Sequence, residues 1–308
     1  MTQLVYGKIF RMVKIAIIGA GELGRALGRI LISPDRKLVY WDCDETKLID
    51  LNPKNVSLPE VLLSAEFVFL CVPSWRVKEF LAFAEHYWPS KTTLVLLSKG
   101  IDEQTGKLPI ELAPKLLPAG VSWVVAGGAM IAEEISTGRF GACLIASRSS
   151  VVAESVIELF KGTNVLALPS VDIKGVAWAG VLKNIYALGL GLAEGLGWTL
   201  NERGLLLAQS LEEILRLMKI LGAQEETFLA PPALADFVAT SFDRNSSNHQ
   251  AGFELGQIGV TDKKSEGLMS LASLLDRLGK KAETFLILQN LAQIIIAHAD
   301  PKKVFGRY

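Results

Sequence analysis

The chain has 308 residues, with 32 lysines and arginines against 32 aspartates and glutamates, so its formal net charge is zero. That length corresponds to two domains or to one large domain. The absence of a basic excess argues against nucleic acid as the main partner. Half of the residues are hydrophobic and 21% are charged, which excludes a disordered or coiled-coil protein.

Cysteine and histidine are scarce, with three residues of each. The cysteines are Cys43, Cys71 and Cys143, and the histidines are His86, His249 and His298. The cysteine spacing fits no CxxC or zinc pattern and predicts reduced thiols in a cytoplasmic protein. No histidine falls in a metal motif, so we predict no bound metal. Residues 1–11 lack the features of a secretory signal, and we expect either a tail or a segment that precedes a start at Met12.

The first half of the chain alternates apolar runs with helical patterns. Strands are predicted at residues 13–19, 37–42, 66–72, 92–98, 121–126, 142–146 and 165–168. Helices are predicted at residues 22–32, 77–87 and 150–161, with a short helix or turn at 58–64. This alternation implies βαβ units around a parallel sheet.

A glycine pattern follows the first predicted strand. Gly19, Gly21 and Gly24 fit G-x-G-x-x-G between the strand VKIAII and the helix ELGRALGRIL. The first glycine permits a tight turn, the second lets a pyrophosphate approach the backbone, and the third allows close packing of helix on strand. Free N–H groups at the helix N-terminus attract phosphate. The pattern predicts a dinucleotide-binding, Rossmann-type domain, and a glycine-rich turn without a ligand is the alternative.

An acidic residue closes the second predicted strand. Asp42 follows Gly19 by about 20 residues, the usual distance of an acid that binds the adenosine ribose hydroxyls. A negative charge there repels a 2′-phosphate, so we expect NAD as the cofactor, with NADP disfavoured. Asp44 is a competing candidate for this role, and Asp42 could instead be a turn residue.

From about residue 171 the pattern becomes helical. Residues 172–196 are apolar and rich in small residues, and 176–198 is long enough to span a membrane. Lys183, Asn184 and Glu194 interrupt this stretch, so we expect a buried helix and no membrane insertion.

Further helices are predicted at residues 202–221, 264–278 and 282–299, and Gly222 is the expected C-terminal cap of the first of these. No further strand of comparable strength is expected. We therefore predict an α/β fold: a Rossmann-type parallel-sheet domain over residues 1–169, followed by an all-α, substrate-binding domain over residues 170–308.

Polar motifs complete the pattern. In chain order they are Ser98-Lys99-Gly100, Gly128-Ala129-Met130-Ile131-Ala132-Glu133-Glu134, Lys183-Asn184, Asp236-Phe237-Val238-Ala239-Thr240, Arg244-Asn245 and Ser265-Glu266-Gly267. With the glycine pattern, this set resembles the NAD(P)-dependent glycerol-3-phosphate dehydrogenases from about residue 13 to residue 299. The resemblance implies a Rossmann domain and a helical domain, with the substrate held in the cleft between them. It also implies reduction of dihydroxyacetone phosphate to sn-glycerol 3-phosphate with a nicotinamide cofactor. A homodimer is implied both by the resemblance and by the apolar composition.

The resemblance assigns roles to individual residues. Lys183 matches the catalytic lysine, which acts as a general acid and base, and Lys99 matches a second cation in the site. Arg244 and Asn245 match the pair that holds the substrate phosphate, or the cofactor near it. The expected catalytic residues are Lys183, Lys99 and Asp236. The expected substrate contacts are Lys99, Lys183, Asp236, Thr240, Arg244 and Asn245. The expected cofactor contacts are Gly19, Gly21, Glu22, Leu23, Gly24, Asp42, Pro73, Ala132 and Arg244.

These residue types suit the reduction of a phosphorylated ketone. Hydride delivery leaves an alkoxide, which needs a proton and a positive field. A buried lysine beside a second cation has a lowered pKa, which makes it a usable proton donor near neutral pH. The planar guanidinium of an arginine makes paired hydrogen bonds to a phosphate.

Each of these residues also has a structural alternative. Lys183 could be a surface lysine with its stem on apolar neighbours, and Asp236 could be a helix N-cap. Lys99 could belong to a turn at a strand end, and Arg244-Asn245 to a solvated turn in the polar loop 241–252. We expect His249, in that loop, to be exposed and without a role.

Three features depart from the family pattern. Met130 stands where the family has a polar residue that faces the nicotinamide or the substrate. Ala235 replaces the glycine that precedes the site aspartate, and the segment from Asp236 to Arg244 looks short. They motivate two alternatives, a reductase of another small phosphorylated or acidic carbonyl compound and an NAD-binding homologue without activity.

Overall fold

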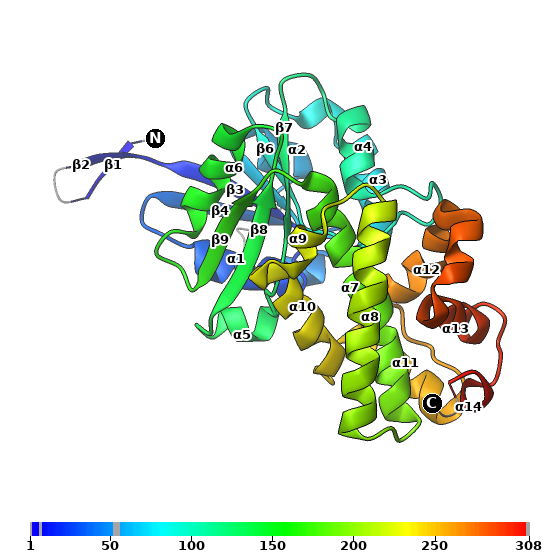
Figure 1. Ribbon diagram of the computed structural model, residues 1–308. Coiled ribbons are helices and arrows are strands. Elements are labelled where there is room, and N and C mark those ends of the chain that lie inside the picture. The colour runs from blue at the N-terminus through cyan, green and yellow to red at the C-terminus, as the bar shows by residue number, and fades with distance from the viewer. Residues whose placement is uncertain (1, 6–7, 52–55, 306–308) are drawn as a thin grey trace. The chain divides into compact units, whose positions relative to one another are not determined.

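A computed structural model describes the backbone of residues 2–5, 8–51 and 56–305, and the side chains of these ranges from residue 12 onward. The chain forms two compact units (Figure 1). Unit 1 comprises Met1–Ser98, Pro109–Ala126 and Met130–Ile173, and unit 2 comprises Lys99–Leu108, Gly127–Ala129 and Lys174–Tyr308. Two short segments of the N-terminal half, one of them carrying Lys99, therefore belong to the mainly C-terminal unit.

Unit 1 is built on a seven-stranded sheet. Its strands are β3 (Val13–Ile18), β4 (Arg36–Trp41), β5 (Phe67–Leu70), β6 (Thr93–Leu96), β7 (Ser122–Gly127), β8 (Gly141–Ala146) and β9 (Val165–Ser170), in the order β4-β3-β5-β6-β7-β8-β9. The pairs β3–β4, β3–β5, β5–β6, β6–β7 and β8–β9 are parallel. Continuous apolar runs form these strands because helices cover a parallel sheet on both faces. The predicted parallel sheet is confirmed.

Four helices of unit 1 lie where the sequence predicts them: α1 (Glu22–Leu31), α2 (Leu58–Leu63), α3 (Ser74–Phe83) and α6 (Ser150–Ile157). Two short helices, α4 (Pro109–Leu116) and α5 (Ala132–Ser136), were not predicted. Pro109 and Pro114 obscure the helical signal of α4, and α5 is too short to show a period. Strands β1 (Thr2–Val5) and β2 (Lys8–Arg11) pair antiparallel as a separate sheet instead of forming a simple tail.

Unit 2 is helical, and the described part of the chain has no strand after β9. Its helices are α7 (Ile173–Gly195), α8 (Leu200–Ile220), α9 (Glu225–Leu229), α10 (Pro231–Phe242), α11 (Ser247–Ile258), α12 (Glu266–Leu278), α13 (Leu286–Ile295) and α14 (Pro301–Val304). By length and composition α7 could cross a membrane, but its apolar window is entirely buried. The predicted buried helix is therefore confirmed.

Glycines bring α7 and α11 into backbone contact. A Cβ added to Gly191 or Gly195 on α7 would overlap the backbone of α11, and one added to Gly252 or Gly256 on α11 would overlap that of α7. Each pair is spaced by four residues, so each helix presents both of its glycines on one face. The first residues of α11 consequently lie beside the middle of α7.

Two expectations for this region were wrong. Asp236 is not an N-cap, because Pro231 already occupies the first turn of α10, whose N-cap residue is Ala230. The segment 241–252 is not one continuous loop, because α11 begins at Ser247. The sequence of α11 resembles a loop because it has few apolar residues and contains Gly252 and Gly256. In the structure these glycines allow close packing of the helix. Gly222 follows α8 with a φ of 73°, as its expected capping role requires.

Candidate active site

The glycine loop lies at the carboxyl end of β3. Its Gly19 has a φ of 96°, and its N–H donates to the carbonyl of Trp41 at 2.8 Å. A Cβ on Gly19 would lie 2.7 Å from the carbonyl oxygen of Cys71, so only glycine fits there. Gly24 packs against the Gly19 carbonyl and Ile17, which sets α1 tightly on the sheet. The first and third glycines thus have the structural roles predicted for them.

The structure of the loop fits a bound dinucleotide. Gly21 is the N-cap residue of α1 and makes no side-chain cap, and a Cβ built on it would meet nothing within 4 Å. The N–H groups of the first turn of α1, which begins with Glu22 and Leu23, are therefore open to a phosphate. β3 lies between β4 and β5, the arrangement at which parallel α/β sheets bind ligands.

The other predicted cofactor contacts lie at element boundaries. Pro73 is the N-cap residue of α3, just after β5, and Ala132 is the first residue of α5. Asp42 follows β4 and is only 8% exposed. Its carboxylate accepts the N–H of Ala20 at 2.8 Å and the N–H of Asp44 at 2.9 Å. Asp42 therefore braces the glycine loop and places a negative charge beside it.

Four of the predicted site residues meet in unit 2. The ammonium of Lys183, on α7, donates to Thr240 Oγ1 at 2.8 Å and lies 3.1 Å from Asp236 Oδ1. The ammonium of Lys99 donates to Asp236 Oδ2 at 2.6 Å and to the carbonyl of Gly128 at 2.9 Å. Asp236 and Thr240 lie one turn apart on α10. A single buried carboxylate thus pairs with two lysines that come from different segments.

Burial and charge set the protonation of this cluster. Burial lowers the pKa of Lys183 from its usual 10.5 to about 8, because the raising effect of Asp236 is smaller and Lys99 lowers the value further. Burial alone would raise the pKa of Asp236, but the charges of Lys183 and Lys99 hold it below its usual range. Around neutral pH the cluster is therefore an ionised carboxylate between cations, with one lysine close to titration.

A chain of amides supports the backbone of Lys99. Asn184 Nδ2 donates to the carbonyl of Lys99 at 3.0 Å, and Asn248 Nδ2 donates to Asn184 Oδ1 at 2.9 Å. Asn248 Oδ1 in turn accepts the N–H of Gly267 at 2.9 Å. Sequence reasoning missed Asn248. Its spacing from the buried Leu255 (i, i+7) could have placed it on the buried face of a helix.

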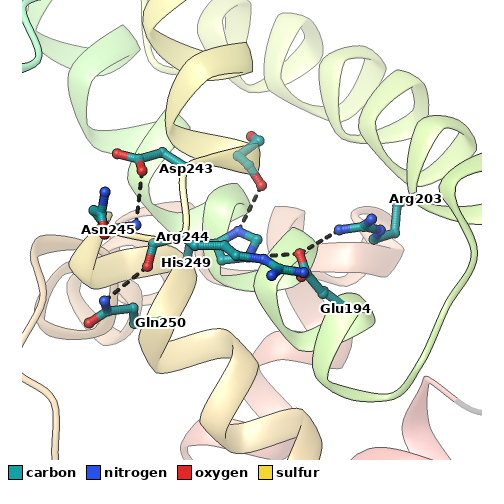
Figure 2. Close-up of polar contacts among 8 residues, drawn as sticks. Glu194, Arg203, Asp243, Arg244, Asn245, His249 and Gln250 are labelled. Carbon is teal, nitrogen blue, oxygen red and sulfur yellow. Dashed lines mark hydrogen bonds and ion pairs between the residues drawn. The ribbon is translucent and has the colours of Figure 1, made fainter. Parts of the chain in front are cut away.

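The structure does not bring Arg244 and Asn245 to the lysines. Figure 2 shows Arg244 directed at Glu194, with Nε 2.9 Å from Glu194 Oε1, and its side chain is 81% exposed. Asn245 is exposed, and its backbone N–H donates to the carboxylate of Asp243. Glu194 lies three turns beyond Lys183 on α7, about 16 Å along the helix axis. The expected roles of Arg244 and Asn245 therefore stay predictions.

Two further expectations are corrected. His249 is 1% exposed, not an exposed loop residue, because it lies in the first turn of α11 where Gly191 admits the backbone closely. Met130 is 7% exposed and belongs to the apolar core of unit 1, together with residues such as Leu97 and Ala126. Its thioether is a packing group, so the departure from the family pattern at this position no longer argues for a different substrate.

Comparisons with known proteins agree with this arrangement. The N-terminal family described as NAD-dependent glycerol-3-phosphate dehydrogenase matches residues 14–153, and its C-terminal counterpart matches residues 172–306. A glycerol-3-phosphate dehydrogenase [NAD(P)+] of Clostridium perfringens is 31% identical over 264 residues, which cover 80% of each chain. The enzyme of the same name from Rhodospirillum rubrum is 30% identical over 79% of this chain and 74% of its own.

The chain belongs to the family of NAD(P)-dependent glycerol-3-phosphate dehydrogenases. A solved member of the family, from Coxiella burnetii, superposes with a TM-score of 0.85 at 25% identity and covers 96% of this chain and 99% of its own. The fold is also similar to that of a PanE/ApbA family ketopantoate reductase from Ralstonia eutropha, with a TM-score of 0.63 at 17% identity, over 96% of this chain and 100% of that one.

Proposed function

We propose that this chain interconverts dihydroxyacetone phosphate and sn-glycerol 3-phosphate with NADH and NAD, in the cytoplasm and as a homodimer. Dinucleotide binding is assigned to the sheet domain within residues 1–169. Substrate binding is assigned to the helical domain within residues 170–308, with the segments 99–108 and 127–129. The observation that carries the proposal is the buried Lys183, held by Asp236 and Thr240 with its pKa lowered to about 8.

The lysine cluster supplies the proton and the positive field that the reaction needs. An ammonium has three N–H donors, and Lys183 directs two of them at Thr240 and Asp236. The third can donate to the carbonyl oxygen of the substrate, and that proton neutralises the alkoxide as it forms. Lys99 adds a second positive charge on the other side of Asp236. In the oxidation direction, neutral Lys183 accepts the proton of the hydroxyl group.

The dinucleotide is assigned to the glycine loop. Gly19 and Gly24 shape the loop, Gly21 leaves the first turn of α1 open to the pyrophosphate, and Asp42 places a negative charge near the expected ribose. When bound, NADH supplies the hydride. We expect a higher kcat/KM with NADH than with NADPH, because Asp42 repels a 2′-phosphate. Equal or greater efficiency with NADPH would contradict this assignment, and Asp42→Asn is expected to narrow the difference.

Arg244 and Asn245 are proposed to contact a phosphate group of the substrate or of the cofactor. A three-carbon substrate is shorter than three helical turns, so one molecule cannot contact Lys183 and Arg244 while Arg244 stays on Glu194. The 81% exposure of the Arg244 side chain allows it to leave Glu194. If the assignment holds, Arg244→Ala raises the KM of either the substrate or the cofactor by about tenfold, which corresponds to one lost charge-assisted contact. Unchanged KM values for both the substrate and the cofactor would contradict the assignment.

The test of the proposed function is the oxidation of NADH by the full chain with dihydroxyacetone phosphate. Lys183→Met is expected to lower kcat by about 1000-fold, as for the loss of a general acid, without weakening NADH binding. Lys280→Met, at an exposed lysine, serves as the matched control. NADH binding without turnover of dihydroxyacetone phosphate by the unaltered chain would contradict the proposed substrate. The molar mass measured by light scattering tests the proposed homodimer.

A further inference from the structure

A second ionic cluster surrounds Glu194, which lies near the C-terminal end of α7 (Figure 2). The Glu194 side chain is 10% exposed and accepts hydrogen bonds from Arg203 and Arg244, and His249 Nε2 lies 3.1 Å from its carboxylate. Arg203 and His249 both contact Oε2, whereas Arg244 contacts Oε1. His249 is buried, the Arg203 side chain is 18% exposed, and the Arg244 side chain is largely exposed.

Both ring nitrogens of His249 face oxygen acceptors. Nδ1 lies 2.8 Å from the carbonyl oxygen of Ser241, and Nε2 lies 3.1 Å from Glu194 Oε2. A neutral imidazole has one donor and one acceptor nitrogen, so it would turn a lone pair toward one of these oxygens. Only the imidazolium, in which both nitrogens donate, satisfies both contacts.

The carboxylate beside the His249 ring is ionised. Burial raises the pKa of Glu194, but the hydrogen bond from Arg244 and the charges of Arg203 and His249 outweigh it and hold the pKa below its usual range. The same carboxylate pairs with Arg203 and Arg244. The nearby carboxylate of Asp243 turns instead to the backbone N–H of Asn245.

The carbonyl that His249 contacts belongs to the last turn of α10. Carbonyl groups of a last helical turn lack intrahelical partners, and the helix dipole favours a cation beside them. Ser241 directly follows Thr240, the residue that accepts the hydrogen bond of Lys183. The imidazole therefore joins the end of α10, which carries Asp236 and Thr240, to α7, which carries Lys183 and Glu194.

We propose that His249 is a buried imidazolium that caps α10 and, through Glu194, fixes Asp236 and Thr240 against Lys183. In this role His249 and Glu194 are positioning residues, because they act through α10 and contact no reacting group. The expected effect on kcat rests on the proposed function. The charge of His249 and its effect on the titration of Lys183 do not depend on that function.

The first test is a nitrogen spectrum of the histidine rings in the full-length protein at a pH of about 7. His249→Gln identifies the His249 signals, and the exposed His86 and His298 provide internal references. We expect both ring nitrogens of His249 to carry hydrogens that exchange slowly with water. A ring with one unprotonated nitrogen would overturn the proposal.

The second test follows the titration of Lys183 in Glu194→Gln, with Glu212→Gln at an exposed position of α8 as the matched control. Loosening α10 moves Asp236 away, and Asp236 raises the pKa of Lys183. We therefore expect Lys183 to titrate at lower pH in Glu194→Gln, both in the lysine carbon spectrum and in the alkaline limb of kcat. A loss of kcat of about 10- to 100-fold is expected from the misplacement.

The outcomes separate the two proposals. A folded Glu194→Gln variant in which Lys183 titrates as in the unaltered protein overturns the positioning role, whatever its stability. If the unaltered chain fails to reduce dihydroxyacetone phosphate but the spectra show the imidazolium and the shifted lysine, the proposed function fails and the positioning role stands. If Glu194→Gln does not fold, the ring spectrum of the unaltered protein decides the charge of His249. His249→Gln, whose neutral amide can keep only one of the two contacts, then decides the effect on Lys183.

Discussion

The glycine loop of unit 1 and the lysine cluster of unit 2 are assembled in opposite ways. The loop consists of the consecutive residues 19–24, and its shape depends on backbone geometry at the end of one strand. The cluster joins Lys99, Lys183 and Asp236, and the ion pair of Lys99 spans 137 residues of sequence. A ligand site made of backbone is set locally, whereas one made of paired charges is set by the packing of several helices.

The two regions also differ in how they respond to pH. The glycine loop offers backbone N–H groups, which do not titrate in the physiological range. The cluster contains a lysine whose pKa is lowered to about 8 and an aspartate whose pKa is held below its usual range. Cofactor binding should therefore be less sensitive to pH than catalysis.

The largest effect is expected at the third glycine of the loop. A Cβ at Gly24 would overlap the Gly19 carbonyl, so Gly24→Ala must displace α1 from the sheet. We expect a loss of about 3 kcal/mol in the free energy of unfolding, together with the loss of NADH binding. Gly21→Ala is the matched comparison, since its Cβ points into open space.

Gly21→Ala is expected to keep the stability of the unaltered protein but to weaken NADH binding, because the new methyl group faces the predicted pyrophosphate position. Thermal unfolding and NADH fluorescence titration measure the two effects separately. Tight NADH binding by Gly21→Ala would show that the dinucleotide does not approach this part of the loop.

A loss of stability of similar size, but without the loss of NADH binding, is expected at the carboxylate of the cluster. Asp236→Asn leaves two lysines without their counter-charge, and we expect a loss of about 3 kcal/mol in the free energy of unfolding near pH 7. Because the pKa of Asp236 is held below its usual 3.8, its ionised form stabilises the fold above that value, and this contribution is lost as the pH falls through the lowered pKa.

Asp236→Asn should therefore be less sensitive to acid than the unaltered protein, although it is less stable at neutral pH. Denaturant unfolding over a series of pH values measures this, with Asp262→Asn at an exposed position as control. Parallel pH dependences for Asp236→Asn and the unaltered protein would show that Asp236 is not the titrating group.

The smallest effect is expected at Lys99, and its sign is informative. Lys99 lowers the pKa of Lys183 whereas Asp236 raises it. Lys99→Gln should therefore move the alkaline limb of kcat to higher pH, and Asp236→Asn should move it to lower pH. Shifts of the two variants in the same direction would contradict the electrostatic account of the cluster.

The sequence alone allowed much of unit 1 to be predicted. Its strands are continuous apolar runs, and the three glycines of the loop lie within six residues, so the motif can be recognised in the sequence. The positive φ of Gly19 and the close packing of Gly24 agree with the separate roles predicted for them. The long apolar α7 was also predictable, because the charges of Lys183 and Glu194 indicated burial in protein and not in lipid.

The remainder depends on distant packing. The residues from Ser247 to Gly252 resemble a polar loop, but the glycines of α7 and α11 let this segment fold as a helix against α7. That contact buries Asn248 and His249, and neither residue carries a local signal of its partner. The pairing of Arg244 with Glu194 was hidden for the same reason, since the two residues lie 50 positions apart.

The central claim, that Lys183 is the proton donor and acceptor, is tested most directly by the pH dependence of kcat in both directions. In the reduction of dihydroxyacetone phosphate, kcat should be constant at neutral pH and fall above a pKa of about 8 as Lys183 loses its proton. In the oxidation of sn-glycerol 3-phosphate, kcat should rise through the same pKa to a plateau. Profiles without this mirror-image transition near pH 8, or a transition that persists in Lys183→Met, would contradict the account.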